Sequence, residues 1–123
     1  MTTYEQLLAD CIRWAKEAGR IQLELFRSDR LDIEAKFNDS DVVTNADKAS
    51  EKAIISEIRR AYPEHSVLSE EAGCDKRMND WLWVIDPLDG TTNYSSGLPN
   101  FCVSIGVQHK GQTVVGVVYA PYL

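Results

Sequence analysis

Two aspartates, Asp86 and Asp89, stand three residues apart where an apolar segment, residues 81–85, ends. Pro87 lies between them, and its ring fixes its own backbone φ and removes one N–H donor, which predicts a stiff turn. Across such a turn both carboxylates can point into one space, and the carbonyl oxygen of Leu88 can join them as a neutral ligand. A ligand set made only of oxygen atoms favours a hard cation such as Mg²⁺, whereas zinc prefers His or Cys. The sequence therefore predicts a magnesium site at the end of this segment.

The residues after the two aspartates are suited to bind phosphate. Gly90 permits close approach of the backbone, and Thr91 with the two residues after it has the composition of a helix start. The N–H groups at a helix N-terminus bind phosphate groups. Because metal ions beside an anion site neutralise the charge that develops in phosphoryl transfer, this arrangement predicts a phosphatase.

Three further residues could converge on the same space. Glu70 would add a metal ligand, and Asp47 could orient a threonine hydroxyl that helps to deprotonate the attacking water. Lys36 could reach a phosphate as a mobile point charge. Each feature taken alone also has a simpler interpretation. The aspartate pair would be a plain turn, Glu70 a surface residue, Asp47 a capping box with Thr44, and Lys36 a solvated lysine.

Two helices and then strands must position these residues. Helical spacing predicts a first helix over residues 4–27, and a capping residue at Thr44 predicts a second one that Pro63 ends. Segments rich in β-branched and aromatic residues follow, and the last of them divides at a turn over residues 110–112. The first helix is expected to bury a stripe made of Leu8, Cys11, Ile12, Ala15, Ala18, Gln22, Leu25 and Phe26.

This order of elements predicts an α+β fold, with two helices packed on one face of a mostly antiparallel sheet. The other face, expected to be rich in Val and Ile, would then lack a cover. We expect a partner chain or a missing second half to bury it.

Composition and charge limit the classes of protein to which the chain can belong. The chain has 123 residues, of which 44% are hydrophobic and 26% charged, as in one soluble globular domain. A net charge of -6 without a basic run argues against nucleic acid as a main partner. The charged N-terminal segment, residues 1–20, offers neither a signal peptide nor a membrane span, which predicts a cytoplasmic protein with no membrane partner. The odd number of cysteines, three, without a C-x-x-C spacing predicts reduced thiols, and both histidines, His65 and His109, are interpreted as structural.

Residues 83–94, WVIDPLDGTTNY, resemble the signature of the inositol monophosphatase family, which comprises Mg²⁺-dependent, lithium-sensitive sugar-phosphate phosphatases. Lys36 with residues 41–47, residues 63–71 and residues 97–107 agree with that family in order and spacing. The resemblance implies that residues 1–123 form the N-terminal metal- and phosphate-binding domain of such an enzyme, half of a layered αβαβα sandwich. It also implies two or three Mg²⁺ ions, a small phosphorylated substrate and a homodimer.

The resemblance assigns roles position by position. The metal ligands would be Glu70, Asp86, the carbonyl of Leu88, and Asp89. The residues that activate the water would be Glu70, Thr91 and Asp47. The substrate phosphate would be bound by Lys36, Gly90, Thr91 and Asp89.

The chain also departs from the family pattern. Family members usually carry an aromatic residue, a hydrophobic residue and a His after the Asn, where this chain has Tyr94, Ser95 and Ser96. Their second half supplies a further Asp in a Trp-Asp-x-Ala-type motif, which does not occur here. We therefore expect the C-terminal domain to be absent and turnover by this chain alone to be weak or nil.

Two alternatives stay open. The substrate could be 3′-phosphoadenosine phosphate or fructose bisphosphate, as for other enzymes of the same superfamily. The chain could instead be an inactive interaction module that docks its open sheet face on a partner.

Overall fold

The helices begin at local capping motifs. The computed structural model describes residues 2–35, 42–70 and 72–123. Its helices are α1 (Tyr4–Leu25), α2 (Asn45–Ala61) and α3 (Thr91–Ser95). Reciprocal capping boxes start the two long helices, formed by Thr3 with Gln6 in α1 and by Thr44 with Asp47 in α2. The capping box predicted at Thr44 is therefore confirmed.

The strands form two sheets. They are β1 (Ile33–Ala35), β2 (Val42–Thr44), β3 (Ser66–Ser69), β4 (Gly73–Asp75), β5 (Trp81–Asp89), β6 (Cys102–His109) and β7 (Gln112–Tyr119). Strands β1 and β2 pair antiparallel as a small separate ladder, and the others form one sheet in the order β4-β3-β5-β6-β7. Every neighbouring pair in the larger sheet is antiparallel except β3 and β5, which run parallel.

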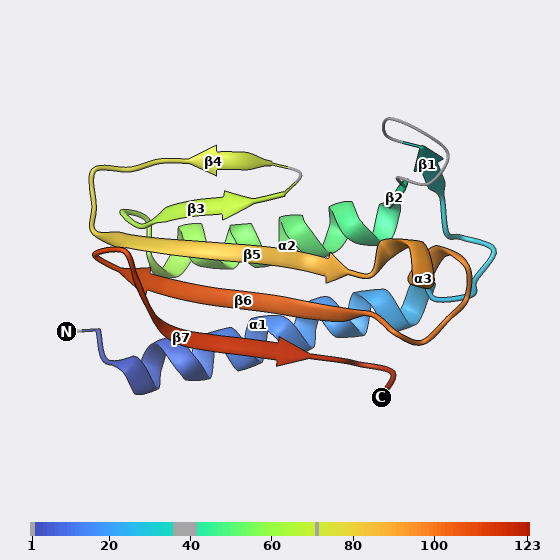
Figure 1. Ribbon diagram of the computed structural model, residues 1–123, viewed down its shortest axis with the longest axis horizontal. Helices are drawn as coiled ribbons and strands as arrows, with labels where there is room; N and C mark the ends of the chain where they lie inside the picture. The colour runs from blue at the N-terminus through green and yellow to red at the C-terminus, as the bar shows by residue number, and fades with distance from the viewer. Residues whose placement is uncertain (1, 36–41, 71) are drawn as a thin grey trace.

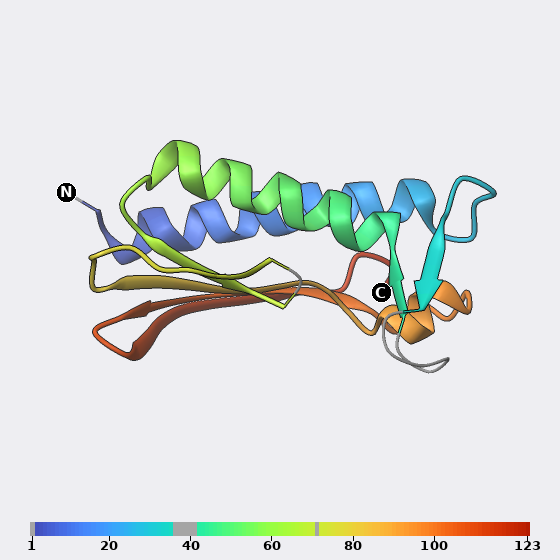
Figure 2. The same ribbon diagram turned by 90° about the horizontal axis from the view of Figure 1, so that it is seen from above.

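The helices α1 and α2 cover one face of the larger sheet, as Figures 1 and 2 show. The core lies between these two layers. Its buried apolar side chains are Leu7, Cys11, Trp14, Ala15 and Ala18 of α1, Ile54 and Ile58 of α2, and Val67, Trp83, Ile85, Val103, Ile105, Val107 and Val115 of the sheet. The predicted α+β fold with helices on a mostly antiparallel sheet is confirmed.

The buried stripe of α1 differs from the prediction by its orientation. Leu8 and Ile12 were expected inside but are 42% and 39% exposed, whereas Leu7 and Trp14 are buried. Trp14 packs its ring against Trp83 of β5, with ring centroids 5.5 Å apart. The helix therefore turns the face that carries its largest ring toward the sheet.

The second sheet face is less apolar than expected. Because side chains alternate along a strand, Ile85 and Ile105 face the helices with the rest of the core. On the other face Leu68, Val84, Gly106 and Gly116 are successive register partners across four strands, so two of these four positions carry no side chain. Exposed apolar residues on this face include Val118, which is 73% exposed.

The turn expected at residues 110–112 joins β6 and β7. Lys110 and Gly111 both adopt left-handed backbone conformations, with φ of 52° and 82°. Two successive residues of that kind match the right-handed twist of the paired strands. Within the described part of the chain, no helix is long and apolar enough to cross a membrane.

Candidate metal and phosphate site

The parallel pair β3 and β5 brings two of the predicted acids to one edge of the sheet. Ser69 is the register partner of Ile85, so Glu70, just after β3, and Asp86, within β5, are the next residues along the two neighbouring strands. In an antiparallel pair the ends of the two strands would lie at opposite edges. Figure 1 shows α3 and the β1–β2 ladder at this same end of the molecule.

The segment from Asp86 to Asp89 is a bulge and not the turn predicted from its composition. Strand β5 continues through Asp89, and its register with β6 shifts between Asp86, opposite Ser104, and Asp89, opposite Cys102. Pro87 has no N–H to give to the ladder, which makes a bulge a suitable place for it. The bulge re-aims the side chains at the site while β5 stays paired.

Helix α1 is hydrogen-bonded to this bulge through Gln22. The Nε2 atom of Gln22 donates to the Pro87 carbonyl at 2.6 Å and to the Ser50 hydroxyl at 3.1 Å. Gln22 is fully buried, and its Oε1 has no hydrogen-bond partner among the described residues. The Tyr94 hydroxyl of α3 donates to the backbone carbonyl of Gln22 at 2.8 Å. Through these bonds one residue of α1 is tied to β5, α2 and α3.

Asp47 uses its two carboxylate oxygens for two purposes. Its Oδ2 accepts from the Thr44 backbone N–H at 2.8 Å and from the Thr44 hydroxyl at 2.6 Å, which completes the cap of α2. Its Oδ1 accepts from the Thr91 hydroxyl at 2.8 Å, and the Thr91 oxygen lies 3.1 Å from the Leu88 carbonyl. One side chain therefore both caps α2 and accepts a hydrogen bond from the Thr91 hydroxyl.

The electrostatics of Asp86 report how closely the acids are grouped. Burial and, in decreasing order, the negative charges of Asp89, Glu70 and Asp47 together raise the pKa of Asp86 from its ordinary 3.8 to about 6. A backbone hydrogen bond from Leu88 acts in the opposite direction. Burial and the charges of Asp89 and Asp86 likewise raise the pKa of the Cys102 thiol. A nearby cation would relieve this crowding of negative charge.

Gly90 joins the bulge to α3 in a conformation that requires glycine. Its φ is 90°, in the left-handed region, and a Cβ atom there would lie 2.7 Å from the Asn100 carbonyl oxygen. The Gly90 carbonyl then accepts from the Tyr94 N–H at 2.9 Å. A side chain at this position would therefore clash with the backbone at Asn100.

The donor chemistry of these residues fits a hard divalent cation. Carboxylates at Asp86, Asp89 and Glu70 with the Leu88 carbonyl are oxygen donors of the kind that Mg²⁺ and Ca²⁺ bind. In residues 2–35, 42–70 and 72–123, no three or more His, Cys, Asp or Glu side chains converge closely enough to enclose a metal by themselves. Mg²⁺ commonly keeps several of its waters and is bound through one or two carboxylates, so it does not require a closed cage of protein ligands.

Most of the predicted residues come together, and two supporting residues were not predicted as such. Thr91 contacts Asp47, and Asp89, Glu70 and Asp47 act on Asp86. Lys36 lies outside the described residues. The sequence analysis placed Gln22 in an apolar stripe and gave no role to Glu51, whose Oε2 accepts from the Ser69 hydroxyl at 2.5 Å. A polar residue within an apolar helical stripe was the available signal for Gln22.

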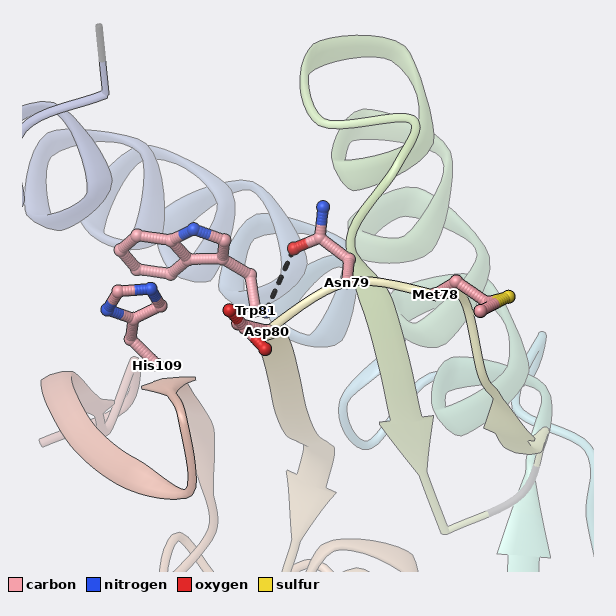
Figure 3. A pocket seen from close by; sticks show the side chains of 5 residues that line it. All are labelled: Met78, Asn79, Asp80, Trp81 and His109. Carbon is pink, nitrogen blue, oxygen red and sulfur yellow. Dashed lines mark hydrogen bonds between the residues drawn. The ribbon is translucent and has the colours of Figure 1, made fainter.

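A hollow lies at the opposite end of β5, and the rings of Trp81 and His109 lie on one side of it (Figure 3). Met78, Asn79, Asp80, Trp81 and His109 line it. His109 stacks on Trp81 with centroids 4.1 Å apart, and His65 stacks on Trp81 at 5.4 Å. His65 also accepts from the indole N–H of Trp83 through Nδ1, at 2.9 Å. These contacts agree with the structural interpretation of both histidines.

Comparisons with known proteins show which family the chain resembles. A model of the inositol monophosphatase family matches residues 3–123. The Nus factor SuhB of Pasteurella multocida is 50% identical over 117 residues, covering 94% of this chain and 43% of that protein. The solved inositol monophosphatase from Anabaena (Nostoc) sp. PCC 7120 has a TM-score of 0.79 at 38% identity, covering 98% of this chain and 42% of its own. A solved IMPase/NADP phosphatase complexed with Mg²⁺ and phosphate has a TM-score of 0.83 at 25% identity, covering 98% and 46%. The chain thus spans less than half the length of these relatives.

Proposed function

This chain belongs to the inositol monophosphatase family, and we propose that it is the metal-binding and water-activating part of a divalent-metal-dependent phosphomonoesterase. Its substrate would be an inositol phosphate or a related sugar phosphate. Residues 1–123 would act as the N-terminal domain, and a C-terminal domain would complete the substrate pocket. The same family also leaves 3′-phosphoadenosine phosphate and fructose bisphosphate as substrate classes, because the residues that would separate them are not in this chain.

The observation that carries the proposal is the hydrogen bond from the Thr91 hydroxyl to Asp47 Oδ1, at 2.8 Å. Because that bond uses the hydroxyl hydrogen, a lone pair of the Thr91 oxygen can accept a hydrogen bond from a water. Asp47 is held by its cap at Thr44, so its carboxylate keeps Thr91 in one orientation. Thr91 and Asp47, with Glu70, would then hold the attacking water and receive its proton.

The metal would be held by Asp86, Asp89, Glu70 and the Leu88 carbonyl. When bound, divalent ions would neutralise charge on the phosphate and lower the pKa of a bound water. The solved relative with Mg²⁺ and phosphate supports a divalent metal, and we propose Mg²⁺, with two or three ions and inhibition by lithium. Gly90, Thr91, Asp89 and Lys36 would face the substrate phosphate.

Mg²⁺ binding tests this proposal directly. Calorimetric titration of the 123-residue chain with Mg²⁺ should show saturable binding, and Asp89→Asn should abolish it. The matched control is Asp80→Asn, since Asp80 is exposed at the opposite end of β5 and should bind Mg²⁺ like the wild type. A parallel assay of phosphate release from inositol 1-phosphate should detect slow turnover with Mg²⁺ and none with EDTA. Absence of Mg²⁺ binding by the wild type would overturn the proposal.

One observation favours a second candidate function. The Pasteurella relative carries the name Nus factor and not that of a phosphatase. The chain would then act as an interaction module through its open sheet face, in a homodimer or with another partner, and the absence of a nucleic-acid partner remains a prediction. Val118 lies on this face, so Val118→Lys should disrupt such an assembly without affecting Mg²⁺ binding. Sedimentation equilibrium at several concentrations would measure the change, and a monomer at all concentrations would exclude the homodimer.

A cytoplasmic location also remains a prediction.

A further inference from the structure

Glu51 on α2 contacts the chain on both sides of Glu70. Its Oε2 accepts from the Ser69 hydroxyl at 2.5 Å and from the Ala72 backbone N–H at 3.2 Å. Ser69 is 2% exposed, so its hydroxyl is shielded from bulk water. One carboxylate oxygen thus ties the last residue of β3 to the start of the connection that follows Glu70.

Glu51 stands four residues after Asp47 on the same helix. Residues four apart lie on one face of an α-helix, one turn above the other. Asp47 fixes Thr91, which follows β5, and Glu51 fixes the segment that follows β3. Two successive turns of α2 therefore hold the ends of the two parallel strands that carry the acids of the site.

We propose that Glu51 is a positioning residue, which sets the place of the Glu70 carboxylate beside Asp86. This proposal rests on the proposed function, because it gives Glu70 a ligand's role. Hydrogen bonds to a carboxylate are stronger than bonds between neutral groups, and here the acceptor belongs to a helix packed against the sheet. Without the bonds to Glu51, Ser69 and Ala72 would lose their attachment to α2, and Glu70 would sample more positions relative to Asp86.

The test compares two substitutions of Glu51. Glu51→Ala removes both bonds, whereas Glu51→Gln keeps an oxygen that can accept them. The matched control is Glu57→Gln, since Glu57 lies on the same helix in a surface ion pair with Arg60. Titration with Mn²⁺ as the probe, followed by electron paramagnetic resonance, measures affinity. Hydrogen exchange of the Ala72 amide measures the contact itself, without any metal present.

We expect Glu51→Ala to weaken Mn²⁺ binding about tenfold, as is usual when a group that orients a metal ligand is lost. The Ala72 amide should exchange faster in the same variant. Glu51→Gln should bind Mn²⁺ within about threefold of the wild type, and Glu57→Gln should bind equally well. Unchanged affinity or unchanged Ala72 exchange in Glu51→Ala would overturn the inference.

Ser69→Ala gives a second test if Glu51→Ala fails to fold. It removes one of the two bonds and should weaken Mn²⁺ binding to a smaller extent, while unchanged affinity would overturn the inference. The measurements also distinguish failure of the role proposed for Glu51 from failure of the proposed function. Wild-type binding that Asp89→Asn abolishes and the Glu51 and Ser69 variants leave intact would overturn only the role of Glu51. A wild-type chain that binds no Mn²⁺ would overturn both.

Discussion

The two ends of β5 are built for opposite purposes. At its start, Trp81 and Trp83 pack in a group of rings with His65, His109 and Tyr62, and the buried indole N–H of Trp83 donates to His65. At its other end, Asp86 is partly buried among like charges. The first end stabilises the fold, and the second retains an unfavourable grouping of charge that a bound cation would relieve. One strand of nine residues therefore both anchors the core and carries a site whose grouped negative charges are unfavourable in the folded state.

The largest effect is expected at the aromatic end. Trp83 is fully buried and its ring packs against Trp14 and Tyr62, so Trp83→Ala should lower the free energy of unfolding by about 3–5 kcal/mol. Urea denaturation followed by circular dichroism would measure it. Tyr4→Ala is the control, because Tyr4 is 54% exposed and should change the free energy by less than about 0.5 kcal/mol. A loss below about 1 kcal/mol in Trp83→Ala would show that the rings do not anchor this end.

A smaller effect is expected where α1 supports the acidic end. Gln22→Leu keeps the approximate size of the side chain but leaves the Pro87 carbonyl without its donor, which should cost about 1–2 kcal/mol of unfolding free energy. The bulge should also lose its anchor, so Mg²⁺ binding should weaken. Denaturation and calorimetry on the same variant would measure both. Gln112→Leu, at an exposed position, should change neither quantity, and equal effects of the two substitutions would contradict the role of Gln22.

The acidic end should gain stability when one charge is removed. In EDTA near neutral pH, Asp86→Asn should raise the free energy of unfolding by about 1 kcal/mol, because the raised pKa of Asp86 reflects an unfavourable charge in the folded state. This figure is lower than the shift alone implies, since the side chain is still partly solvated. The same substitution should abolish Mg²⁺ binding. A destabilised variant would show that the grouped acids do not repel one another.

The smallest effect is a difference in pH dependence between the two ends. Burial lowers the pKa of His65 below its ordinary 6.5, so below that pH the unfolded chain binds the proton more readily and the folded state loses stability. Asp86 acts in the opposite direction, because with its pKa raised to about 6 the folded state takes up a proton first as the pH falls. In the Asp86→Asn background, the free energy of unfolding should therefore fall between about pH 7.5 and pH 5.5.

Denaturant titrations at the two pH values would measure this fall. Adding His65→Gln should make the curve flatter. If the free energy of unfolding depends on pH equally with and without His65, another group must account for that dependence.

Sequence reasoning succeeded where a residue acts through its neighbours in the chain. The cap of α2 depends on Thr44 and Asp47, three residues apart, and was predicted. The bulge at Pro87 was predicted as a turn, because its shape depends on β6 and on Gln22, which is 65 residues away. Strand β4 was not predicted, since its three exposed residues have no apolar alternation and are held as a strand only by pairing with β3.

The site residues followed the same rule. The grouping of Asp86, Asp89 and Thr91 could be predicted from their closeness in sequence. Glu70 and Asp47 could be proposed from their residue types, and the resemblance to a known family then assigned them the same roles. The role of Glu51 could not be predicted, because its contacts with Ser69 and Ala72 exist only once α2 packs against the sheet. Helix orientation had the same origin, since the position of Trp83 decides which face of α1 is buried.

The parallel pairing of β3 with β5 also determines where the chain can change in length. Both strands deliver their acids at one edge, while the connection between them passes through β4 and returns to the opposite edge at Trp81. Residues added near Met78, which is fully exposed, would lengthen this return path without moving either strand end. Such a position is suited to insertion of a fluorescent tag or a short loop, so that the site could be studied with its own geometry kept intact.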